Sequence, residues 1–452
     1  MMHFFYSRTI DLTKGPIIRS IIAFSVPLLL SSVLQQLYST VDLLFVSNVL
    51  GVNATAALGI STLLISCLIG LFNGLSVGAN VVVAIAFGKN GSSVHRVIAS
   101  SLLLGAVGGL VLSVAGFFLA PFFIEVMKTP PSSVDDALVY LRTYFVAMVA
   151  VALYNMASGV CRALGDSMTP LYSQAVGGAM NIACNWLFLC VLHYGVEGVA
   201  FATLISNVFS AAIVVYPLWV NKELGLRVFD LFKIDRFAVK RIFRIGAPVG
   251  LQAMVISLSN VVIQYQIDLL GADAIAAFSI YYKVELPIYL AILAIGQAVT
   301  TFVAQNKGAG SFDRARKGAR VCQGLGLGVS LALSVLMLSF GSEIYQIFSR
   351  DGAVIEYGLK VIAVTFPFYF LYSILEVQGD VARGLGHSLV PAVIILLNIC
   401  LLRSVLVFAF SWNAVSIECI AATYPITWAT TAICMVVYRL YLTRRIFTRS
   451  AA

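Results

Sequence analysis

Long apolar runs, broken by short polar or glycine-containing segments, recur along the whole chain. No Lys, Arg, Asp or Glu occurs between Asp42 and Lys89. This run is too long for one membrane span of about 20 residues, so a turn near Gly51 must divide it. The same reading predicts twelve helices, six in each half, over residues 17–48, 55–86, 95–119, 136–160, 169–192, 197–220, 241–270, 274–305, 318–340, 355–379, 388–411 and 416–440.

These runs predict an all-α integral membrane protein with twelve transmembrane helices. They are about twice as long as a strand needs to cross a bilayer and do not alternate polar with apolar residues, which excludes a membrane β-barrel. The composition agrees with this class, because 60% of the 452 residues are hydrophobic, 11% are charged and the mean hydropathy is +0.96. Such values lie far outside the range of soluble domains.

The second half of the chain repeats the first at a spacing of roughly 220 residues. The matching segments are AFSVPLLLSS at Pro27 with RIGAPVGLQA at Pro248, VLGVNATAAL at Gly51 with LLGADAIAAF at Gly271, AIAFGKNGS at Gly88 with AQNKGAGS at Gly308, and RALGDSMTP at 162–170 with RGLGHSLVP at 383–391. We therefore expect two homologous six-helix bundles, over residues 1–220 and 241–452, joined by a cytoplasmic linker at 221–240. Paired bundles of this kind are typical of secondary transporters, so transport is the first hypothesis.

The net charge of +9 indicates an orientation in the membrane. Lys and Arg residues, Arg162 and Arg383 among them, concentrate in the predicted segments on the side of the N-terminus and in the C-terminal tail. By the positive-inside rule, both termini of this multi-pass protein are cytoplasmic, and we expect it in the cell (inner) membrane. Nucleic-acid binding is not expected, because the basic residues are spread over many short loops.

Motifs of enzymes and of ATP-driven pumps are missing from the sequence. It contains no Walker motif GxxxxGK[ST] and no catalytic residue set, so we expect neither an enzyme nor direct coupling to ATP. The eight cysteines form no CxxC pair and have no neighbouring His, so no metal site and no cofactor are expected. The expected partners are small organic substrates, a coupling ion and membrane lipids, and the protein is expected to be a monomer.

Asp42 is the candidate for ion coupling, because an ionised side chain in hydrocarbon is costly and needs a reason to be there. It lies about 10 Å below the outer end of the first predicted helix, one turn above Tyr38. Asn181 and Asn185 share one face of the fifth helix, and with Thr203 on the sixth they arrive at a similar depth. These side chains either form one polar pocket in the N-terminal half, or Asp42 is a structural aspartate capped by neighbouring hydroxyl groups.

The second half has diverged at these positions. Asp42 falls opposite Val262 or Ile263, and Asn181 and Asn185 fall opposite Leu402 and Leu406. The second half instead has intramembrane charges at Lys283, Glu285, Glu376, Asp380 and Arg403. Glu285 either pairs with Arg403 across helices or faces the substrate, and both stand as candidate substrate-binding residues. Tyr282 is a third, since tyrosine rings hold flat organic cations by stacking and cation–π attraction.

In these motifs the chain resembles the multidrug and toxic compound extrusion (MATE) transporters over nearly its whole length. The resemblance rests on Pro27 with Asp42 fifteen residues later, on the Gly51 turn, on Gly88, on RALGDSMTP and on the second-half copies. It implies a V-shaped pair of six-helix lobes, an N-lobe and a C-lobe, that exports drugs or toxic metabolites in exchange for H⁺ or Na⁺. The family's first-helix acid falls on Asp42, and its bendable proline falls on Pro27.

The nearest resemblance is to the DNA-damage-inducible (DinF-like) branch of that family. In this branch an Asn and an Asp four apart on helix 5 and a Thr on helix 6 complete the N-lobe site, and they fall on Asn181, Asn185 and Thr203. Asn185 replaces the Asp, and Ile256 stands where another branch has a cation-binding Glu. Both departures favour H⁺ as the coupling ion, with Na⁺ as the alternative.

The expected mechanism is antiport through the N-lobe. Asp42 takes up a proton from outside, and the first helix then bends near Pro27, where the proline removes a backbone hydrogen bond. The bend shrinks the N-lobe cavity and expels a hydrophobic, often cationic organic compound. The alternative is a lipid-linked oligosaccharide flippase of the same superfamily, whose pyrophosphate would need a cationic cavity, for which Lys283 and Arg403 are the deep basic candidates.

Overall fold

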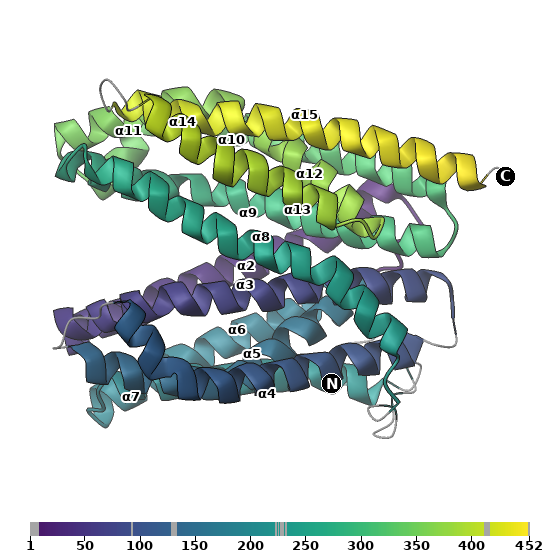
Figure 1. The fold of residues 1–452 in the computed structure, drawn as a ribbon, viewed down its shortest axis with the longest axis horizontal. Helices are drawn as coiled ribbons and strands as arrows, with labels where there is room; N and C mark the ends of the chain where they lie inside the picture. The colour runs from purple at the N-terminus through teal and green to yellow at the C-terminus, as the bar shows by residue number, and fades with distance from the viewer. Residues whose placement is uncertain are drawn as a thin grey trace. The chain divides into compact units, whose positions relative to one another are not determined.

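The computed structural model describes residues 9–91, 94–127, 133–221, 224, 226, 230, 233–410 and 416–450. Within these residues, twelve helices are long and apolar enough to cross a membrane, and the described elements are all helical. This confirms the predicted all-α membrane fold (Figure 1).

The first half contains six spans, two of which end in a short π-helical segment. They are α2 (Ile17–Phe45) with η1 (Val46–Leu50), α3 (Val52–Gly88), α4 (Val94–Val126), α5 (Val134–Ala163), α6 (Met168–Asn185) with η3 (Trp186–Val191), and α7 (Val196–Val220).

The second half again contains six spans. They are α8 (Arg236–Asp268), α9 (Ala272–Gly308), α10 (Phe312–Phe348), α11 (Gly352–Thr365) continued through the 3₁₀ turn η5 (Phe366–Phe368) into α12 (Tyr369–Gly384), α13 (Leu389–Ile395) continued through the π-helical segment η6 (Leu396–Leu402) into α14 (Arg403–Phe410), and α15 (Ile417–Ser450). The predicted linker lies partly outside the described residues, and α8 already begins at Arg236.

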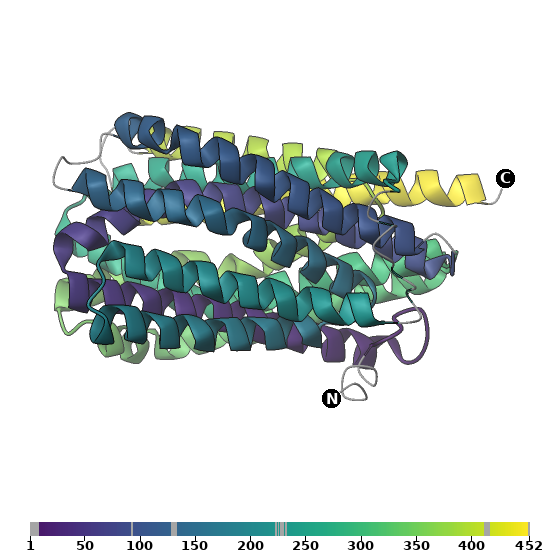
Figure 2. The same ribbon diagram turned by 90° about the horizontal axis from the view of Figure 1, so that it is seen from below.

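The helices form two compact units. Unit 1 consists mainly of Val26–Gly250, and unit 2 mainly of Leu251–Lys307 and Ser311–Ala452. In unit 1, α5 packs against α3, α4 and α7, and α6 packs along α7; in unit 2, α12 packs against α10 and α15. Within each unit the helices run along a common long axis, which the turned view also shows (Figure 2).

Within unit 1, α3 and the first half of α8 cross in direct backbone contact at two pairs of glycines. A Cβ atom at Gly74 would lie 2.5 Å from Cα of Gly250, and a Cβ atom at Gly78 would lie 2.9 Å from the backbone nitrogen of Gly246. Small residues four apart on both helices permit such a close approach. The glycines therefore set the distance between these two helices.

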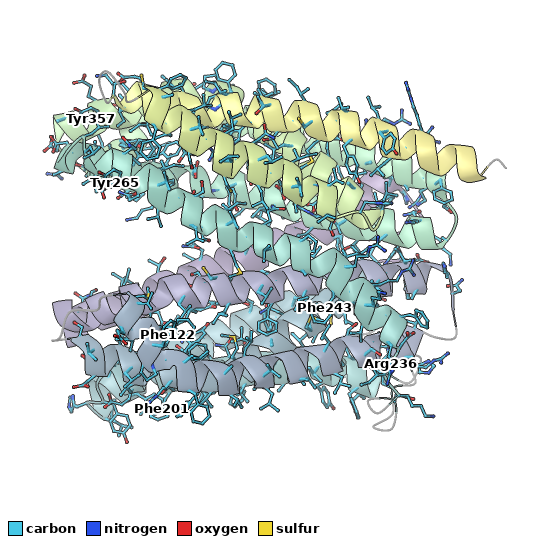
Figure 3. All side chains as sticks on the ribbon, viewed as in Figure 1. Phe122, Phe201, Arg236, Phe243, Tyr265 and Tyr357 are labelled. Atoms are coloured by element: carbon cyan, nitrogen blue, oxygen red, sulfur yellow. The ribbon has the colours of Figure 1, made fainter. Side chains whose placement is uncertain are left out.

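Large apolar side chains are exposed on both units. Phe122 and Phe201 in unit 1 are 57% and 41% exposed, and Tyr265 in unit 2 is 58% exposed (Figure 3). Exposed apolar surface of this extent is unfavourable in water and favourable against lipid. The surface thus fits a protein surrounded by a bilayer.

The prediction that Arg162 and Arg383 are loop cations is wrong. Arg162 lies in the last turn of α5 and Arg383 in the last turn of α12, because both helices continue several residues beyond the ends predicted from hydropathy. Arg383 is only 4% exposed, and Arg162 donates a hydrogen bond of 2.9 Å to Oγ of Ser76. Each arginine is therefore held by polar groups inside its own unit.

Candidate functional site

Two helices of unit 1 bring the predicted N-lobe residues together. On α2, Tyr38 and Asp42 are four residues apart and so lie on the same face. On α6, Gly178, Asn181 and Asn185 follow the same three-and-four spacing. The two faces meet, since a Cβ atom at Gly178 would lie 3.5 Å from Cβ of Tyr38.

Asp42 and the two asparagines form a continuous hydrogen-bonded chain. The amide nitrogen Nδ2 of Asn185 donates to Oδ1 of Asp42, and the same nitrogen donates to Oδ1 of Asn181 over 3.2 Å. Both asparagines are buried, at 2% and 0% exposure, whereas Asp42 is half-buried. The structure therefore places three of the predicted side chains in one polar site.

This site is built from oxygen acceptors and a single acid. Oδ1 of Asn185 is buried and accepts no hydrogen bond from the residues that the structure describes. Asp42 takes part in none of the ion pairs within 4.0 Å found in that part of the chain. A proton, which Asp42 can bind, or a hard cation that prefers oxygen ligands is the kind of charge such a group of atoms can accept.

Two other predicted residues lie outside this hydrogen-bonded chain. Thr203 on α7 is buried, and its hydroxyl donates to the carbonyl oxygen of Val199 in its own helix over 3.0 Å. Pro27 lies inside α2, fifteen residues before Asp42, and is buried. Thr203 thus bonds to its own backbone, and Pro27 has the place of a hinge rather than of a ligand.

Sequence reasoning missed Gln174 on the same face of α6. Its side chain is 7% exposed and accepts a hydrogen bond of 2.7 Å from the hydroxyl of Tyr154 on α5. The signal was present, because Gln174 lies seven residues before Asn181 and so repeats on the same side of the helix. The polar face of α6 therefore extends from Gln174 to Asn185.

In unit 2, the predicted pair of Glu285 and Arg403 is not joined. Neither residue belongs to an ion pair within 4.0 Å in the described ranges. The hydroxyl of Tyr369 donates to Oε2 of Glu285 over 3.5 Å, whereas both Nε and Nη2 of Arg403 donate to the hydroxyl of Thr427, over 3.0 and 2.8 Å. Tyr282 shares a hydrogen bond of 3.2 Å with the hydroxyl of Tyr424.

The π-helical segment η6 changes which residues of the two repeats correspond. The sequence alignment sets Asn181 opposite Leu402, but Leu402 is half-buried and Arg403 is the buried residue. A π turn accommodates one residue more than an α turn. Arg403 therefore takes the inward position in unit 2 that Asn181 takes in unit 1.

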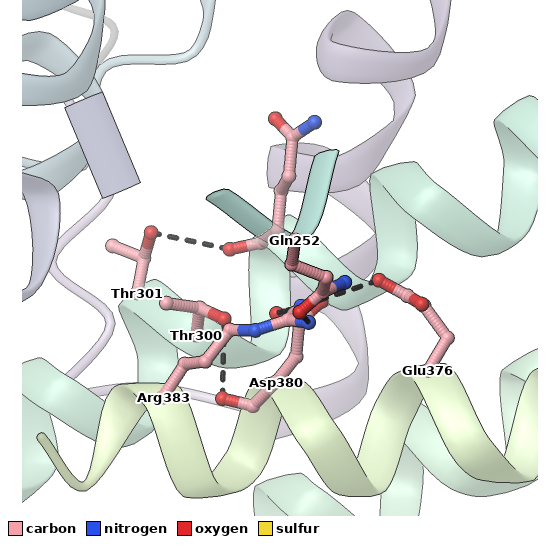
Figure 4. Close-up of polar contacts among 7 residues, drawn as sticks. Gln252, Thr300, Thr301, Glu376, Asp380 and Arg383 are labelled. Atoms are coloured by element: carbon pink, nitrogen blue, oxygen red, sulfur yellow. Dashed lines mark hydrogen bonds and ion pairs between the residues drawn. The ribbon is translucent and has the colours of Figure 1, made fainter. Parts of the chain in front are cut away.

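A second buried polar cluster lies in unit 2 around Arg383, as Figure 4 shows. Nη1 of Arg383 lies 2.7 Å from Oδ1 of Asp380 and 3.3 Å from Oε1 of Glu376. Nη2 donates to Oε1 of Gln252 over 3.3 Å, and the hydroxyl of Thr300 donates to the backbone oxygen of Asp380 over 3.2 Å. One arginine thus faces two carboxylates, and this pairing with Arg383 was not predicted.

The second and fourth spans of each half meet at a glycine. In unit 1 this glycine belongs to the fourth span, and in unit 2 it belongs to the second. In unit 1, a Cβ atom at Gly159 would lie 2.5 Å from the backbone oxygen of Ser76. In unit 2, Gly296 corresponds to Ser76 and Asp380 corresponds to Gly159, and a Cβ atom at Gly296 would overlap Oδ2 of Asp380. The side chain therefore comes from opposite helices in the two units.

Comparison with known sequences finds the same two-fold organisation. The family model MatE matches the chain twice, over residues 27–187 and over residues 248–409. The probable multidrug resistance protein YoeA of Bacillus subtilis (strain 168) is 28% identical over 392 residues, which cover 84% of each chain. The probable multidrug resistance protein YpnP of the same strain is 27% identical over 400 residues, which cover 87% of this chain and 88% of that protein.

Solved structures share the fold. The crystal structure of MATE in the bent conformation matches with a TM-score of 0.91 at 20% identity, over 98% of this chain and 99% of that chain. The crystal structure of MATE in the straight conformation matches with a TM-score of 0.89 at 19% identity, over the same shares of the two chains. Similarity at these identities shows the fold alone.

Proposed function

This chain belongs to the MatE family, and from that premise we propose that it is a multidrug exporter of the cell inner membrane. Its relatives YoeA and YpnP are named probable multidrug resistance proteins. The substrates are hydrophobic, often cationic organic compounds, and they leave the cell in exchange for H⁺. The protein works as a monomer with both termini in the cytoplasm, in agreement with its distribution of Lys and Arg.

The observation that supports this function most directly is the hydrogen bond between Asn185 and Asp42, which joins α6 to the acid on α2. The ionised carboxylate only accepts hydrogen bonds, whereas the protonated one also donates. When Asp42 binds a proton on Oδ1, which now accepts from Asn185, the amide of Asn185 turns its oxygen toward the new donor, and its nitrogen then leaves Asn181. Proton binding on α2 is in this way transmitted to α6.

Pro27 lets α2 bend when Asp42 binds a proton. A proline inside a helix has no N–H, so the carbonyl four residues earlier lacks its usual donor and the helix bends more easily there. A bend near Pro27 moves the following part of α2, which includes Tyr38 and Asp42. Proton uptake and expulsion of the substrate are coupled through this movement.

Na⁺ is the second candidate for the coupling ion. The oxygens of Asp42, Asn181 and Asn185 are ligands of the type that hard cations prefer. The site has one carboxylate, because Asn185 stands where the DinF-like branch has an Asp, and a single acid suits one proton. Asn181 and Thr203, which match that branch, are the reason to propose the assignment to it.

The flippase alternative has less support. It needs a cationic cavity for pyrophosphate, and Lys283 is exposed, with its Nζ 5.9 Å from the centre of the Phe348 ring. Of the two basic residues considered for such a cavity, only Arg403 is buried. A single guanidinium group is a weak basis for binding a lipid pyrophosphate.

The decisive experiment is ethidium transport in everted membrane vesicles under an imposed pH gradient or an imposed Na⁺ gradient. We expect transport with the pH gradient alone in the wild type, its loss in Asp42→Asn, and normal transport in Asp135→Asn, an exposed acid at the start of α5. Transport driven by Na⁺ alone would reassign the coupling ion. Normal pH-driven export by Asp42→Asn would rule out the mechanism.

A further inference from the structure

Arg403 is a buried cation in unit 2 that forms no direct ion pair with the residues that the structure describes. It is 5% exposed, and no carboxylate oxygen among the described residues lies within the 4.0 Å of an ion pair. Removing a guanidinium group from water is costly unless an opposite charge and further hydrogen bonds compensate. Glu285 acts on Arg403 through its charge from beyond this distance, so the guanidinium group has no direct carboxylate partner in that part of the chain and can still bind one.

The described residues bond two of the three nitrogens of the guanidinium group. Nε and Nη2 both donate to the hydroxyl of Thr427, and the carbon Cζ lies 4.3 Å from the centre of the Tyr424 ring. Nη1 donates to none of the residues that the structure describes, and it is not among the fully buried atoms without a partner. Nη1 therefore still has accessible surface and two hydrogens to donate.

A row of aromatic rings continues from Tyr424, the ring over which Arg403 lies. The ring of Tyr424 lies 5.9 Å from that of Trp428, centre to centre, and its hydroxyl is hydrogen-bonded to that of Tyr282. Tyr282 is half-buried and lies 5.8 Å from the ring of Tyr281. Such rings offer faces and edges to a flat molecule, with polar hydroxyls at their ends.

The geometry points to a site in unit 2 that recognises the carboxylate of an aromatic substrate. We propose that Nη1 of Arg403 donates to this carboxylate while the rings of Tyr282 and Tyr424 contact the aromatic part. The inference rests on the proposed export function and extends it from cationic compounds to compounds that also bear a carboxylate. Charge-assisted hydrogen bonds from arginine to carboxylate are among the stronger polar contacts in proteins.

The register of η6 supports the assignment of Arg403 as a specificity-determining residue. Because of the extra residue in that segment, Arg403 points inward at the place where unit 1 has Asn181 in contact with the chain to Asp42. At corresponding positions, unit 1 thus has amides bonded to an acid, and unit 2 has a cation. The two units are therefore suited to ligands of opposite charge at this position.

A pair of dyes that differ at one group provides the test. Rhodamine 110 bears a free carboxylate, and rhodamine 123 is its methyl ester, so the ring system is the same. Binding of both dyes to the purified full-length protein in detergent, followed by fluorescence polarisation, tests the site without transport. Export of both dyes from vesicles then tests whether the site serves transport.

We expect the wild type to bind rhodamine 110 more tightly than rhodamine 123. Arg403→Gln should weaken binding of rhodamine 110 by about tenfold or more, as loss of a charge-assisted hydrogen bond implies, and change binding of rhodamine 123 by less than about twofold. Arg403→Lys, which keeps the charge, should retain part of the preference. Arg350→Gln, an exposed arginine in the loop before α11, is the matched control and should behave as the wild type.

Two results would overturn the inference. One is equal binding of the two dyes by the wild type, and the other is an equal loss for both dyes in Arg403→Gln together with wild-type binding by Arg403→Lys. If Arg403→Gln does not yield folded protein, Arg403→Lys decides: a reduced preference for rhodamine 110 supports the inference, and an unchanged preference or an equal weakening for both dyes overturns it. Preferential binding without export of either dye would contradict the proposed transport function and leave the binding site supported.

Discussion

The side-chain amide of Asn185 donates a hydrogen bond to the carboxylate of Asp42, which lies 143 residues earlier in the chain. A buried amide thus determines the surroundings of the one acid in this site. Since a hydrogen bond to a charged group contributes more than one between neutral groups, Asn185 should matter for the coupling step although it cannot itself bind a proton.

We expect Asn185→Leu to reduce export of ethidium driven by a pH gradient by about tenfold or more, because a hydrogen bond to a charged group is worth about 1.5–3 kcal/mol. Transport in everted vesicles, normalised to the amount of protein, measures the effect. Asn207→Leu is the matched control, since among the described residues the amide of Asn207 donates to the backbone oxygen of Thr203 in its own helix and to no other group. Equal rates for both variants would show that the bond to Asp42 has no part in coupling.

Gly74→Ala should destabilise the protein. The added methyl group would meet backbone atoms of Gly250 and Gly246, at 2.5 and 2.7 Å, which cannot move aside as a side chain can. Overpacking of this kind typically costs about 1–3 kcal/mol. The measurement is the apparent melting temperature in detergent, followed by size-exclusion chromatography with fluorescence detection.

The control for this substitution lies on the same helix. A Cβ atom at Gly59 would meet nothing within 4 Å, and alanine has a better helix propensity than glycine. Gly59→Ala should therefore leave the melting temperature unchanged or raise it slightly. A melting temperature for Gly74→Ala equal to that of the wild type would mean that α3 and α8 do not cross as closely as described.

Arg383→Met should strongly reduce the yield of folded protein. It leaves Glu376 and Asp380 buried without their counter-charge, and removing one partner of a buried ion pair costs about 3–5 kcal/mol. Neutralising all three groups in Glu376→Gln, Asp380→Asn, Arg383→Met should restore much of the yield. If the triple variant is no better than the single one, the cost does not come from uncompensated charge.

The stability of the folded protein should depend on pH because of Asp166. It lies between α5 and α6 and accepts hydrogen bonds from the backbone of Met168 and Thr169. Burial raises the pKa of Asp166, and the hydrogen bonds from Thr169 and Met168 only partly oppose this rise. At a pH between the pKa of Asp in the unfolded state, about 3.9, and the higher pKa in the folded state, Asp166 binds more protons in the folded state than in the unfolded state. This contribution therefore lowers stability as the pH rises through that interval, and it is constant above it.

The test compares melting temperatures from about pH 4 to pH 7 for the wild type, Asp166→Asn and Asp166→Ala. Asp166→Asn keeps a capping oxygen but not the titration, so its stability should decline less with rising pH. Asp166→Ala lacks both the titration and the cap, so it should be less stable than Asp166→Asn by about 1 kcal/mol at every pH. A pH profile of Asp166→Asn identical to that of the wild type would contradict the raised pKa.

Much of the fold could be predicted because apolar runs and their interruptions are direct consequences of the bilayer. The cluster of Asp42, Asn181 and Asn185 was also predictable, since residues four apart share a helix face. The same rule fails where η6 adds a residue to a turn, so that Arg403 rather than Leu402 points inward. Hydropathy likewise ended the tenth span before Arg383, because a single-residue scale cannot show that two carboxylates neutralise it.

The exchanged glycines also limit how far the two halves can be interchanged. A Cβ atom at position 296 would overlap Oδ2 of Asp380, and one at position 159 would lie 2.5 Å from the backbone oxygen of Ser76. A side chain at 296 would therefore displace the carboxylate that pairs with Arg383, whereas one at 159 would push the backbone of α3 away from α5. The Ser76 segment of α3 thus fits in place of the Gly296 segment of α9 only at the expense of the ion pair between Asp380 and Arg383.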